Sequence, residues 1–241
     1  MISKNQIKLI RSLEQKKNRK REGLFVAEGP KVVDDLLQAG YHPKQLFSTT
    51  EYHNAERITE EELHKISFLQ HPQKVLAVFE IPKAQLTLNI TQHLTLALDG
   101  IQDPGNLGTI IRIADWFGIS HIFCSLDTAD LYNPKVVQAT MGSIAHVQVV
   151  YTDLLKLFHT LPPSYPIYGT LLDGENIYEQ ELTQEGIIVM GNEGNGISTE
   201  IRQLVNRRLL IPDFHADGQR AESLNVAIAT AITCSEFRRR K

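Results

Sequence analysis

Cysteine is scarce in this sequence, and long apolar runs are absent from it. The chain has two cysteines among 241 residues, Cys124 and Cys234, each in an apolar stretch. Two isolated thiols are too few for the disulfide framework of a small secreted domain, so we expect both to be buried and reduced. No stretch is apolar over the roughly 20 residues that span a bilayer, and residues 1–6 lack the apolar core of a signal peptide. These absences predict a cytoplasmic protein without a membrane segment.

Metal-ligand spacings are also missing. The nine histidines are scattered, and none has partners at the spacing of a zinc site, so we expect no metal. The sequence has no GxGxxG turn with an acidic residue placed beyond it, which disfavours a Rossmann-type nucleotide site. A hydrophobic content of 42% nevertheless supports one large core or two small ones.

Positive charge is slightly outnumbered by negative charge over the whole sequence but is concentrated near the N-terminus. The formal net charge is −3, yet residues 4–21 hold eight basic side chains against the single acid Glu14, and the last four residues are all basic. A basic end on an acidic body is typical of a protein that binds a phosphate backbone. A solvated run of charge beside a helix would have the same composition. Under the first interpretation, the nucleic-acid-binding residues are Lys16, Lys17, Arg19, Lys20 and Arg21.

Hydrophobic periodicity divides the chain into two α/β domains. Residues 1–80 are predicted to form the smaller domain, residues 81–93 a polar linker and residues 94–241 the larger domain. In the smaller domain we expect helices at 3–17, 30–37 and 60–66, strands at 24–27, 46–48 and 75–79, and a mobile loop at 16–21. In the larger domain we expect strands at 94–98, 121–125, 146–150, 166–171, 187–190 and 208–211, and helices at 107–118, 133–141, 152–160, 198–206 and 223–238. Such alternation is typical of a parallel sheet with helices on both faces.

The stretch from Asn106 to Arg112 follows an expected strand and loop and opens an expected helix. Apolar residues recur at helical spacing after Asn106, which places Arg112 on another face of that helix. Because helical side chains lean toward the N-terminus of their helix, Arg112 should point back at the loop, where α/β proteins place ligands. A structural alternative is that Asn106 caps the helix and Arg112 pairs with Asp115.

Two later segments also suggest a ligand site. Glycines at 191, 194 and 196 follow an expected strand, and glycine allows a ligand to approach the backbone closely, although glycine-rich turns are common in any protein. Ser223, Leu224 and Asn225 open the last expected helix. Ser223 is a plausible N-cap there, and helix N-termini can also donate hydrogen bonds to ligands.

In order and spacing, these three segments resemble the motifs of the SpoU/TrmH family of RNA 2′-O-ribose methyltransferases, which belongs to the SPOUT superfamily. The resemblance covers roughly residues 94–238. The basic run and residues 24–29 resemble the L30e-like substrate-binding domain that precedes many SpoU catalytic domains. The resemblance implies a C-terminal trefoil knot in the sheet domain, S-adenosylmethionine as the methyl donor, and a homodimer formed through the region of the last helix.

The resemblance also implies roles for individual residues. It implies that the protein transfers a methyl group to a ribose 2′-hydroxyl of structured RNA. The L30e-like domain favours rRNA over tRNA as that RNA. The implied catalytic residues are Arg112, Asn106, Glu193, Ser223 and Asn225. The implied cofactor-binding residues are Thr170, Met190, Gly191, Asn192, Gly196, Ile211 and Leu224.

Physical chemistry limits what Arg112 can do in such a reaction. A guanidinium is a very weak acid and stays protonated in proteins, so Arg112 is better suited to bind a phosphate and stabilise a developing alkoxide than to act as a base. We expect Glu193 to hold Arg112 through a charge-assisted pair. A phosphate or a water molecule would then accept the proton.

The sequence departs from the family pattern at two places, and it is compatible with two other functions. Gln138 stands where the related segment usually carries Arg, and the connection 213–222 is longer than usual. The chain could be an RNA-binding protein that has lost its cofactor, but the complete set of Asn106, Arg112, Glu193 and Asn225 argues against this. It could also methylate a base nitrogen, whereas the Asn-Leu-Gly…Arg motif points to ribose.

Overall fold

The computed structural model describes residues 1–82, 90–214 and 223–239. It divides into two compact units: unit 1 contains Met1–Ala84 and Asp130–His146, and unit 2 contains Gln85–Ala129 and Val147–Lys241. Most of the predicted linker and of the 213–222 connection lies outside the described residues. The sequence predicts two domains that follow each other along the chain. Residues 130–146 instead pack with unit 1, although the residues before and after them belong to unit 2.

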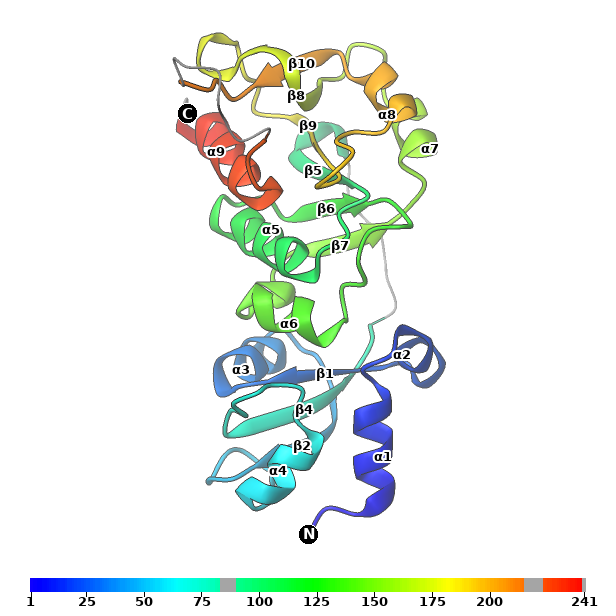
Figure 1. The fold of residues 1–241 in the computed structure, drawn as a ribbon, viewed down its shortest axis with the longest axis vertical. Coiled ribbons are helices and arrows are strands. Elements are labelled where there is room, and N and C mark those ends of the chain that lie inside the picture. Colours follow the sequence, from blue (N-terminus) through cyan, green and yellow to red (C-terminus); the bar gives the residue numbers. More distant parts are fainter. Residues whose placement is uncertain (83–89, 215–222, 240–241) are drawn as a thin grey trace. The chain divides into compact units, whose positions relative to one another are not determined.

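Unit 1 is built on a four-stranded sheet (Figure 1). Its strands are β1 (Leu24–Glu28), β2 (Pro43–Ser48), β3 (Glu56–Arg57) and β4 (Val75–Glu80), in the order β1-β4-β2-β3. Its helices are α1 (Lys4–Ser12), α2 (Lys16–Glu22), α3 (Pro30–Gln38), α4 (Glu60–Ile66), α6 (Pro134–Thr140) and the 3-10 helix η2 (Ser143–Ala145). β4 pairs antiparallel with β1 and β2, and β2 pairs parallel with β3. β1 is therefore an edge strand, and α6 packs against it.

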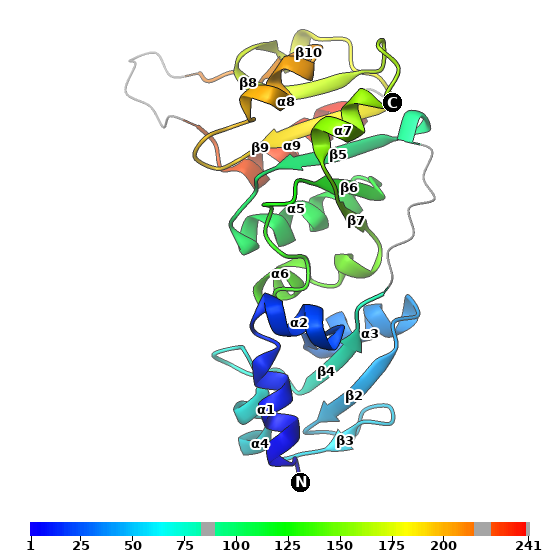
Figure 2. The ribbon, with the colours of Figure 1, turned by 90° about the vertical axis from the view of Figure 1, so that its right-hand side faces the viewer.

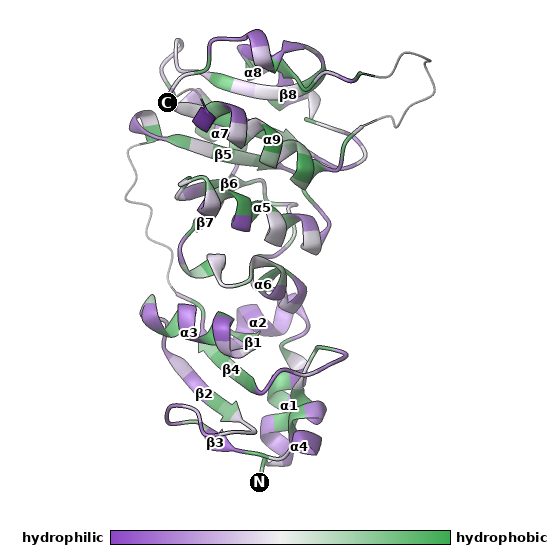
Figure 3. Cartoon of the chain, turned by 90° about the vertical axis from the view of Figure 1, so that its left-hand side faces the viewer, coloured by the Kyte–Doolittle hydropathy of each residue, from purple (hydrophilic) through white to green (hydrophobic). Residues whose placement is uncertain are grey.

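The apolar residues of β1 are buried on both faces of this sheet. Val26 joins a core cluster with residues of α1 and α4, such as Ile10 and Leu63. On the other face, the ring of Phe25 lies 4.7 Å from the ring of Tyr132, measured between centroids. Burial from both sides explains why this strand is a continuous apolar run rather than an alternating one, and the hydrophobic colour of β1 and β4 follows from it (Figure 3).

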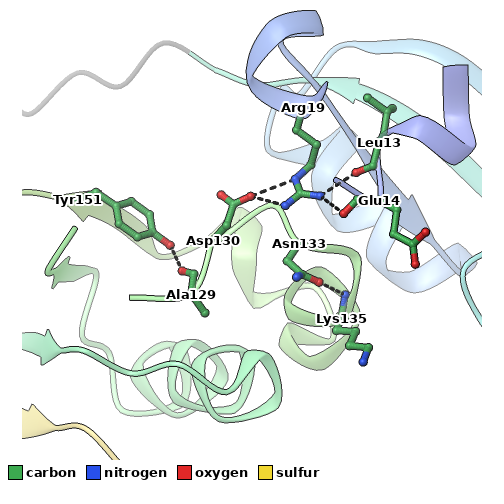
Figure 4. Close-up of polar contacts among 8 residues, drawn as sticks. All are labelled: Leu13, Glu14, Arg19, Ala129, Asp130, Asn133, Lys135 and Tyr151. Carbon is green, nitrogen blue, oxygen red and sulfur yellow. Dashed lines mark hydrogen bonds and ion pairs between the residues drawn. The ribbon is translucent and has the colours of Figure 1, made fainter. Parts of the chain in front are cut away.

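Residues 130–146 are fixed to unit 1 by polar contacts as well. The guanidinium of Arg19 donates to the carboxylate of Asp130 (Figure 4), and Lys31 Nζ donates to the carbonyl of Met141 over 3.1 Å. Gly142 has a φ of 101°, and a Cβ there would lie 1.9 Å from Asp35 Oδ2. Only glycine combines this backbone conformation with this close approach.

Unit 2 is built on a six-stranded sheet in which every pair of neighbours is parallel. Its strands are β5 (Leu94–Asp99), β6 (His121–Cys124), β7 (Gln148–Tyr151), β8 (Ile167–Asn176), β9 (Gly186–Gly191) and β10 (Arg207–Leu210), in the order β10-β8-β9-β5-β6-β7. Its helices are α5 (Pro104–Trp116), α7 (Leu154–His159), α8 (Thr199–Leu204), α9 (Val226–Arg239), and the 3-10 helices η1 (Ile90–Gln92) and η3 (Ile177–Glu179).

Helices cover both faces of this sheet, as Figures 1 and 2 show. On one face, Phe158 of α7 and Ile201 of α8 pack in one cluster with Val189 of β9. On the other face, α5 and α9 pack against each other, and α9 also contacts β9. The predicted α/β class with a parallel sheet is confirmed.

Three local predictions were wrong. Residues 16–21 form helix α2 rather than a loop, because Asn18 and Arg19 are buried and Gly23 ends the helix in the left-handed conformation, with a φ of 65°. Helix α5 is capped by Asp103, whose side chain accepts from the amide of Asn106, so Asn106 is not the cap. The last helix begins at Val226 rather than at residue 223.

Candidate active site

A cavity of about 660 Å³ opens in unit 2 beside the carboxyl ends of β9 and β10. Its lining comes from the middle of β8, the end of β9 and the loop after it, Arg202 of α8, the end of β10 and the start of α9. Ligands of open parallel sheets bind at such a position. All seven residues of the predicted cofactor set line the cavity: Thr170, Met190, Gly191, Asn192, Gly196, Ile211 and Leu224.

The loop after β9 is held tightly by its own backbone. Asn192 and Gly196 exchange two backbone hydrogen bonds of 2.9 Å each, and the side-chain oxygen of Asn192 accepts from the amides of Gly194 and Asn195. A Cβ on Gly191 would lie 2.2 Å from the backbone of Gly196 and Ile197. The loop itself therefore requires glycine at 191, whether or not a ligand approaches the backbone there.

Three of the predicted catalytic residues form one chain of hydrogen bonds. Glu193 Oε1 accepts from the side-chain amide of Asn106 over 3.1 Å, and Asn106 Oδ1 accepts from Asn225 Nδ2 over 3.0 Å. Asn225 Oδ1 also accepts from the amide of Ala227 over 2.9 Å, so Asn225, and not Ser223, caps α9. The chain joins the loop after β9, the first turn of α5 and the start of α9.

Glu193 also binds the backbone of the loop that precedes α5. Its carboxylate also accepts from the backbone amides of Gln102 and Asp103, each over 3.1 Å. Burial alone would raise the pKa of Glu193, but the hydrogen bonds from Asn106 and from the backbone amides outweigh it, and the net pKa lies below its usual value. Glu193 is thus held as an anion that fixes the loop ahead of α5.

Arg112 lies on the exposed side of α5 and is not a member of this chain. The expected ion pair between Arg112 and Glu193 is not formed, because the Glu193 carboxylate is taken up by Asn106 and the backbone amides. Within residues 1–82, 90–214 and 223–239, Arg112 forms no ion pair. Its charge is therefore exposed to solvent. Ser223 is exposed and lines the cavity.

Asp173 is a cavity residue that sequence reasoning missed. It lies on β8 and accepts from Arg202 of α8 and from Arg208 of β10, the latter over 3.1 Å. The parallel pairing of β8 with β10 brings Arg208 to Asp173, and Arg202 lies on α8, the helix that precedes β10. No local spacing in the sequence signals the contact, because its members are 29 and 35 residues apart.

The predicted RNA-binding set divides into two groups. Lys16, Lys17, Lys20 and Arg21 are exposed on α2. Arg19 is only 2% exposed, and its guanidinium donates to the carbonyls of Leu13 and Glu14 as well as to Asp130 (Figure 4). Placing Arg19 in the RNA-binding set was therefore wrong, because every side of its guanidinium already has a partner within unit 1.

None of the described helices is both long and apolar enough to cross a membrane. In the part of the chain that the structure describes, no group of three or more His, Cys, Asp or Glu side chains could hold a metal ion.

Comparison with known proteins identifies the family. The SpoU rRNA methylase family model matches residues 93–235, and the MRM3-like substrate binding domain model matches residues 4–77. The chain is 31% identical to the 23S rRNA (guanosine(2553)-2′-O)-methyltransferase RlmP of Bacillus subtilis, over 98% of this chain and 97% of the relative. The chain therefore belongs to the SpoU rRNA methylase family.

Solved structures agree with this assignment. A protein assigned to the TrmH family of RNA methyltransferases from Porphyromonas gingivalis is 44% identical, with a TM-score of 0.86 over the whole of both chains. The AdoMet-bound rRNA methyltransferase from Sinorhizobium meliloti is 31% identical, with a TM-score of 0.87 over 100% of this chain and 97% of that one.

Proposed function

We propose that this protein transfers a methyl group from S-adenosylmethionine to a ribose 2′-hydroxyl of ribosomal RNA. The observation that carries the proposal is the hydrogen-bonded chain Glu193–Asn106–Asn225, whose member Glu193 lines the same cavity as the predicted cofactor residues. Family membership and the rRNA methyltransferases among its relatives support the same activity.

The cavity suits the methyl donor in size and lining. Its volume of about 660 Å³ lies within the roughly 300–1,000 Å³ of small-molecule sites. Apolar side chains such as Met190, Leu209 and Leu224 line it together with the backbone of the Gly191–Gly196 loop. Apolar walls with a few fixed polar groups match an adenosine-containing ligand. When bound, S-adenosylmethionine supplies an electrophilic methyl group.

The residues of this chain contribute positioning and charge. Glu193 and Asn225 fix the amide of Asn106 from both ends, so the loop ahead of α5 and the start of α9 keep one arrangement. Such fixed geometry lowers the cost of bringing reactants together. The guanidinium of Arg112 stabilises the alkoxide that forms as the hydroxyl loses its proton. An RNA phosphate or a water molecule accepts that proton.

Ribosomal RNA is favoured over tRNA as the substrate. RlmP is named for methylation of 23S rRNA, and the model that matches residues 4–77 is an MRM3-like substrate binding domain. The exposed cations of α2 belong to this domain and provide phosphate contacts. A tRNA substrate and an inactive RNA-binding protein are the alternatives.

A homodimer and a cytoplasmic location are part of the proposal. Trp116 at the end of α5 is 84% exposed and Ile228 on α9 is 53% exposed, and α5 and α9 pack against each other. A second copy would cover these apolar side chains. Cys124 and Cys234 are both buried and free, and burial raises the pKa of each thiol, which suits a reducing compartment. A trefoil knot in unit 2 stays a prediction from the family resemblance.

The proposed activity is tested by mapping ribose methylation on total RNA from cells with and without the gene. We expect one rRNA nucleotide to lose its 2′-O-methyl group in the deletion strain, and purified protein to restore it with S-adenosylmethionine. Loss of a tRNA methyl group instead would support the first alternative. Identical maps, together with no calorimetric signal for S-adenosylmethionine, would support the second.

A further inference from the structure

A second cavity lies entirely within unit 1. Its volume is about 260 Å³, and Val26 and Glu28 of β1 form its buried side. Phe68 and Leu69, which follow α4, also line it, and so do Pro134, Lys135, Gln138 and Ala139 of α6. The cavity exists only because α6, which comes from the middle of the unit 2 sequence, packs against the edge strand β1.

Glu28 places a carboxylate in this otherwise largely apolar space. Glu28 is 5% exposed, and among the described residues each oxygen has one hydrogen-bond partner: Oε1 accepts from the amide of Phe68 over 2.7 Å, and Oε2 accepts from the hydroxyl of Ser67. A carboxylate oxygen can accept two hydrogen bonds, so Glu28 retains acceptor capacity. Buried polar groups favour a partner that satisfies them, and the partner here must donate.

Phe68 presents a supported aromatic ring. The guanidinium of Arg11 lies 4.9 Å from the ring centroid of Phe68, and Arg11 Nη1 donates to the carbonyl of Ser67 over 2.6 Å. Arg11 therefore fixes the segment that carries both the ring and the hydroxyl partner of Glu28. On α6, the amide of Gln138 is half-buried at the cavity and the ammonium of Lys135 is exposed beside it.

We propose that this cavity binds an unpaired guanine base of the RNA substrate. The ligand must be flat and largely apolar to fit between Phe68 and α6, must donate hydrogen bonds to Glu28, and gains from an anionic group near Lys135. An RNA nucleotide meets all three conditions, since proteins read unpaired bases by stacking and by hydrogen bonds to their edges. Among the four RNA bases, guanine alone carries two adjacent N–H donors on one edge, at N1 and at the exocyclic amine.

This inference rests on the proposed function, because it takes RNA as the ligand. It adds a base-specific contact outside the cavity of unit 2. It also gives residues 130–146 a role in substrate recognition, since α6 supplies one side of the cavity.

The first experiment needs no variant. The full-length protein is titrated with guanosine and inosine 5′-monophosphates by ligand-observed NMR, and with two oligouridines that carry one guanosine or one inosine by fluorescence anisotropy. Inosine lacks the exocyclic amine and removes one donor to the carboxylate, so we expect roughly tenfold weaker binding of the inosine probes. Equal affinity for the two oligonucleotides would overturn the proposal.

A matched pair of variants locates the contact. Ala139 is half-buried and lines the cavity, so Ala139→Leu should fill it and abolish the preference for guanosine over inosine. Ala39→Leu makes the same change at an exposed position of unit 1 and should keep the preference. If Ala139→Leu retains the full preference, the base binds elsewhere and the proposal is wrong.

Methyl transfer to rRNA, measured on the same wild-type preparation, separates this inference from the proposed function. If the protein methylates rRNA but binds the guanosine and inosine probes equally well, the proposed activity is supported and the proposed base site is wrong. If the protein prefers guanosine, loses that preference in Ala139→Leu and methylates no RNA, the base site is supported and the proposed activity is wrong.

Discussion

At the scale of single residues, Asn106 joins three segments that are far apart in the sequence. Its side-chain amide donates to Glu193 and its oxygen accepts from Asn225, so both ends of one amide are used. Sequence reasoning expected Asn106 to cap a helix. The cap is Asp103, three residues earlier, which leaves the Asn106 side chain available for these longer-range contacts.

Arg112 is the residue on which the proposed chemistry depends most. Arg112→Ala should slow methyl transfer roughly a hundredfold or more, the usual cost of losing a group that stabilises transition-state charge. Arg112→Lys should also slow methyl transfer strongly, because an ammonium cannot reproduce the planar set of donors of a guanidinium. Single-turnover rates at saturating S-adenosylmethionine and RNA measure both effects.

Binding of S-adenosylmethionine should stay unchanged in both variants, because Arg112 does not line the cavity. Arg207→Ala is the matched control, since Arg207 is an exposed arginine of the same unit outside the cavity lining. Near-wild-type rates for Arg112→Lys would show that Arg112 is only a surface charge.

Glu193 should make the stability of unit 2 depend on pH. Its pKa is lower in the folded chain than in the unfolded chain, so its contribution is present above the unfolded value, about 4.3, and is lost as pH falls through the folded value. Melting temperatures of wild type and Glu193→Gln should therefore differ at neutral pH and converge in acid. Glu200→Gln, at an exposed position of the same unit, is the control. A gap independent of pH would contradict the prediction.

At the scale of elements, α2 shows how a charged segment becomes structural. Its sequence has no apolar residue, so hydrophobic periodicity could not identify it as a helix. The helix is held by Arg19, which crosses to Asp130 and to two carbonyls of the preceding turn (Figure 4). The other cations of α2 remain exposed.

Arg19→Ala should destabilise unit 1 by about 3–5 kcal/mol, because removing one partner of a buried ion pair leaves the other groups unsatisfied. Lys20→Ala changes the adjacent exposed cation and should cost less than about 0.5 kcal/mol. Chemical denaturation of the two variants measures the difference. Equal stability of the two variants would contradict the prediction and would mean that Asp130 and the two carbonyls form hydrogen bonds with water in Arg19→Ala.

At the scale of the whole molecule, RNA affinity should depend on salt through α2. Binding of Lys and Arg to phosphates releases counterions, and each contact contributes roughly 0.7–0.9 to the slope of log affinity against log salt. Replacing Lys16, Lys17, Lys20 and Arg21 with Ala should therefore flatten the slope measured with rRNA fragments. Lys44→Ala with Lys65→Ala, exposed cations of the same unit, is the comparison. An unchanged slope would show that the α2 cations are merely solvated.

The oligomeric state should depend on the exposed apolar side chains of α5 and α9. Trp116→Glu with Ile228→Glu should convert a dimer into a monomer, because a charge without a partner is costly to bury. Light scattering coupled to size exclusion measures the mass. Phe214→Glu changes an aromatic that is 88% exposed and lies outside both helices, and should leave the mass unchanged. A monomeric wild type would contradict the homodimer.

The sequence by itself determined the alternation of strands and helices and the parallel sheet, and its resemblance to the SpoU/TrmH family implied seven of the residues that line the unit 2 cavity. The alternation and the sheet follow from local periodicity, whereas the seven cavity residues follow from motifs shared with the family, which stand at strand ends where parallel sheets bring ligand-binding loops together. Only the tertiary structure decided that Arg19 is buried, that Glu193 holds Asn106 rather than Arg112, and that residues 130–146 complete unit 1. The physical reason is that each of these contacts joins residues 87 or more positions apart, and periodicity reports only the conformation of neighbours along the chain.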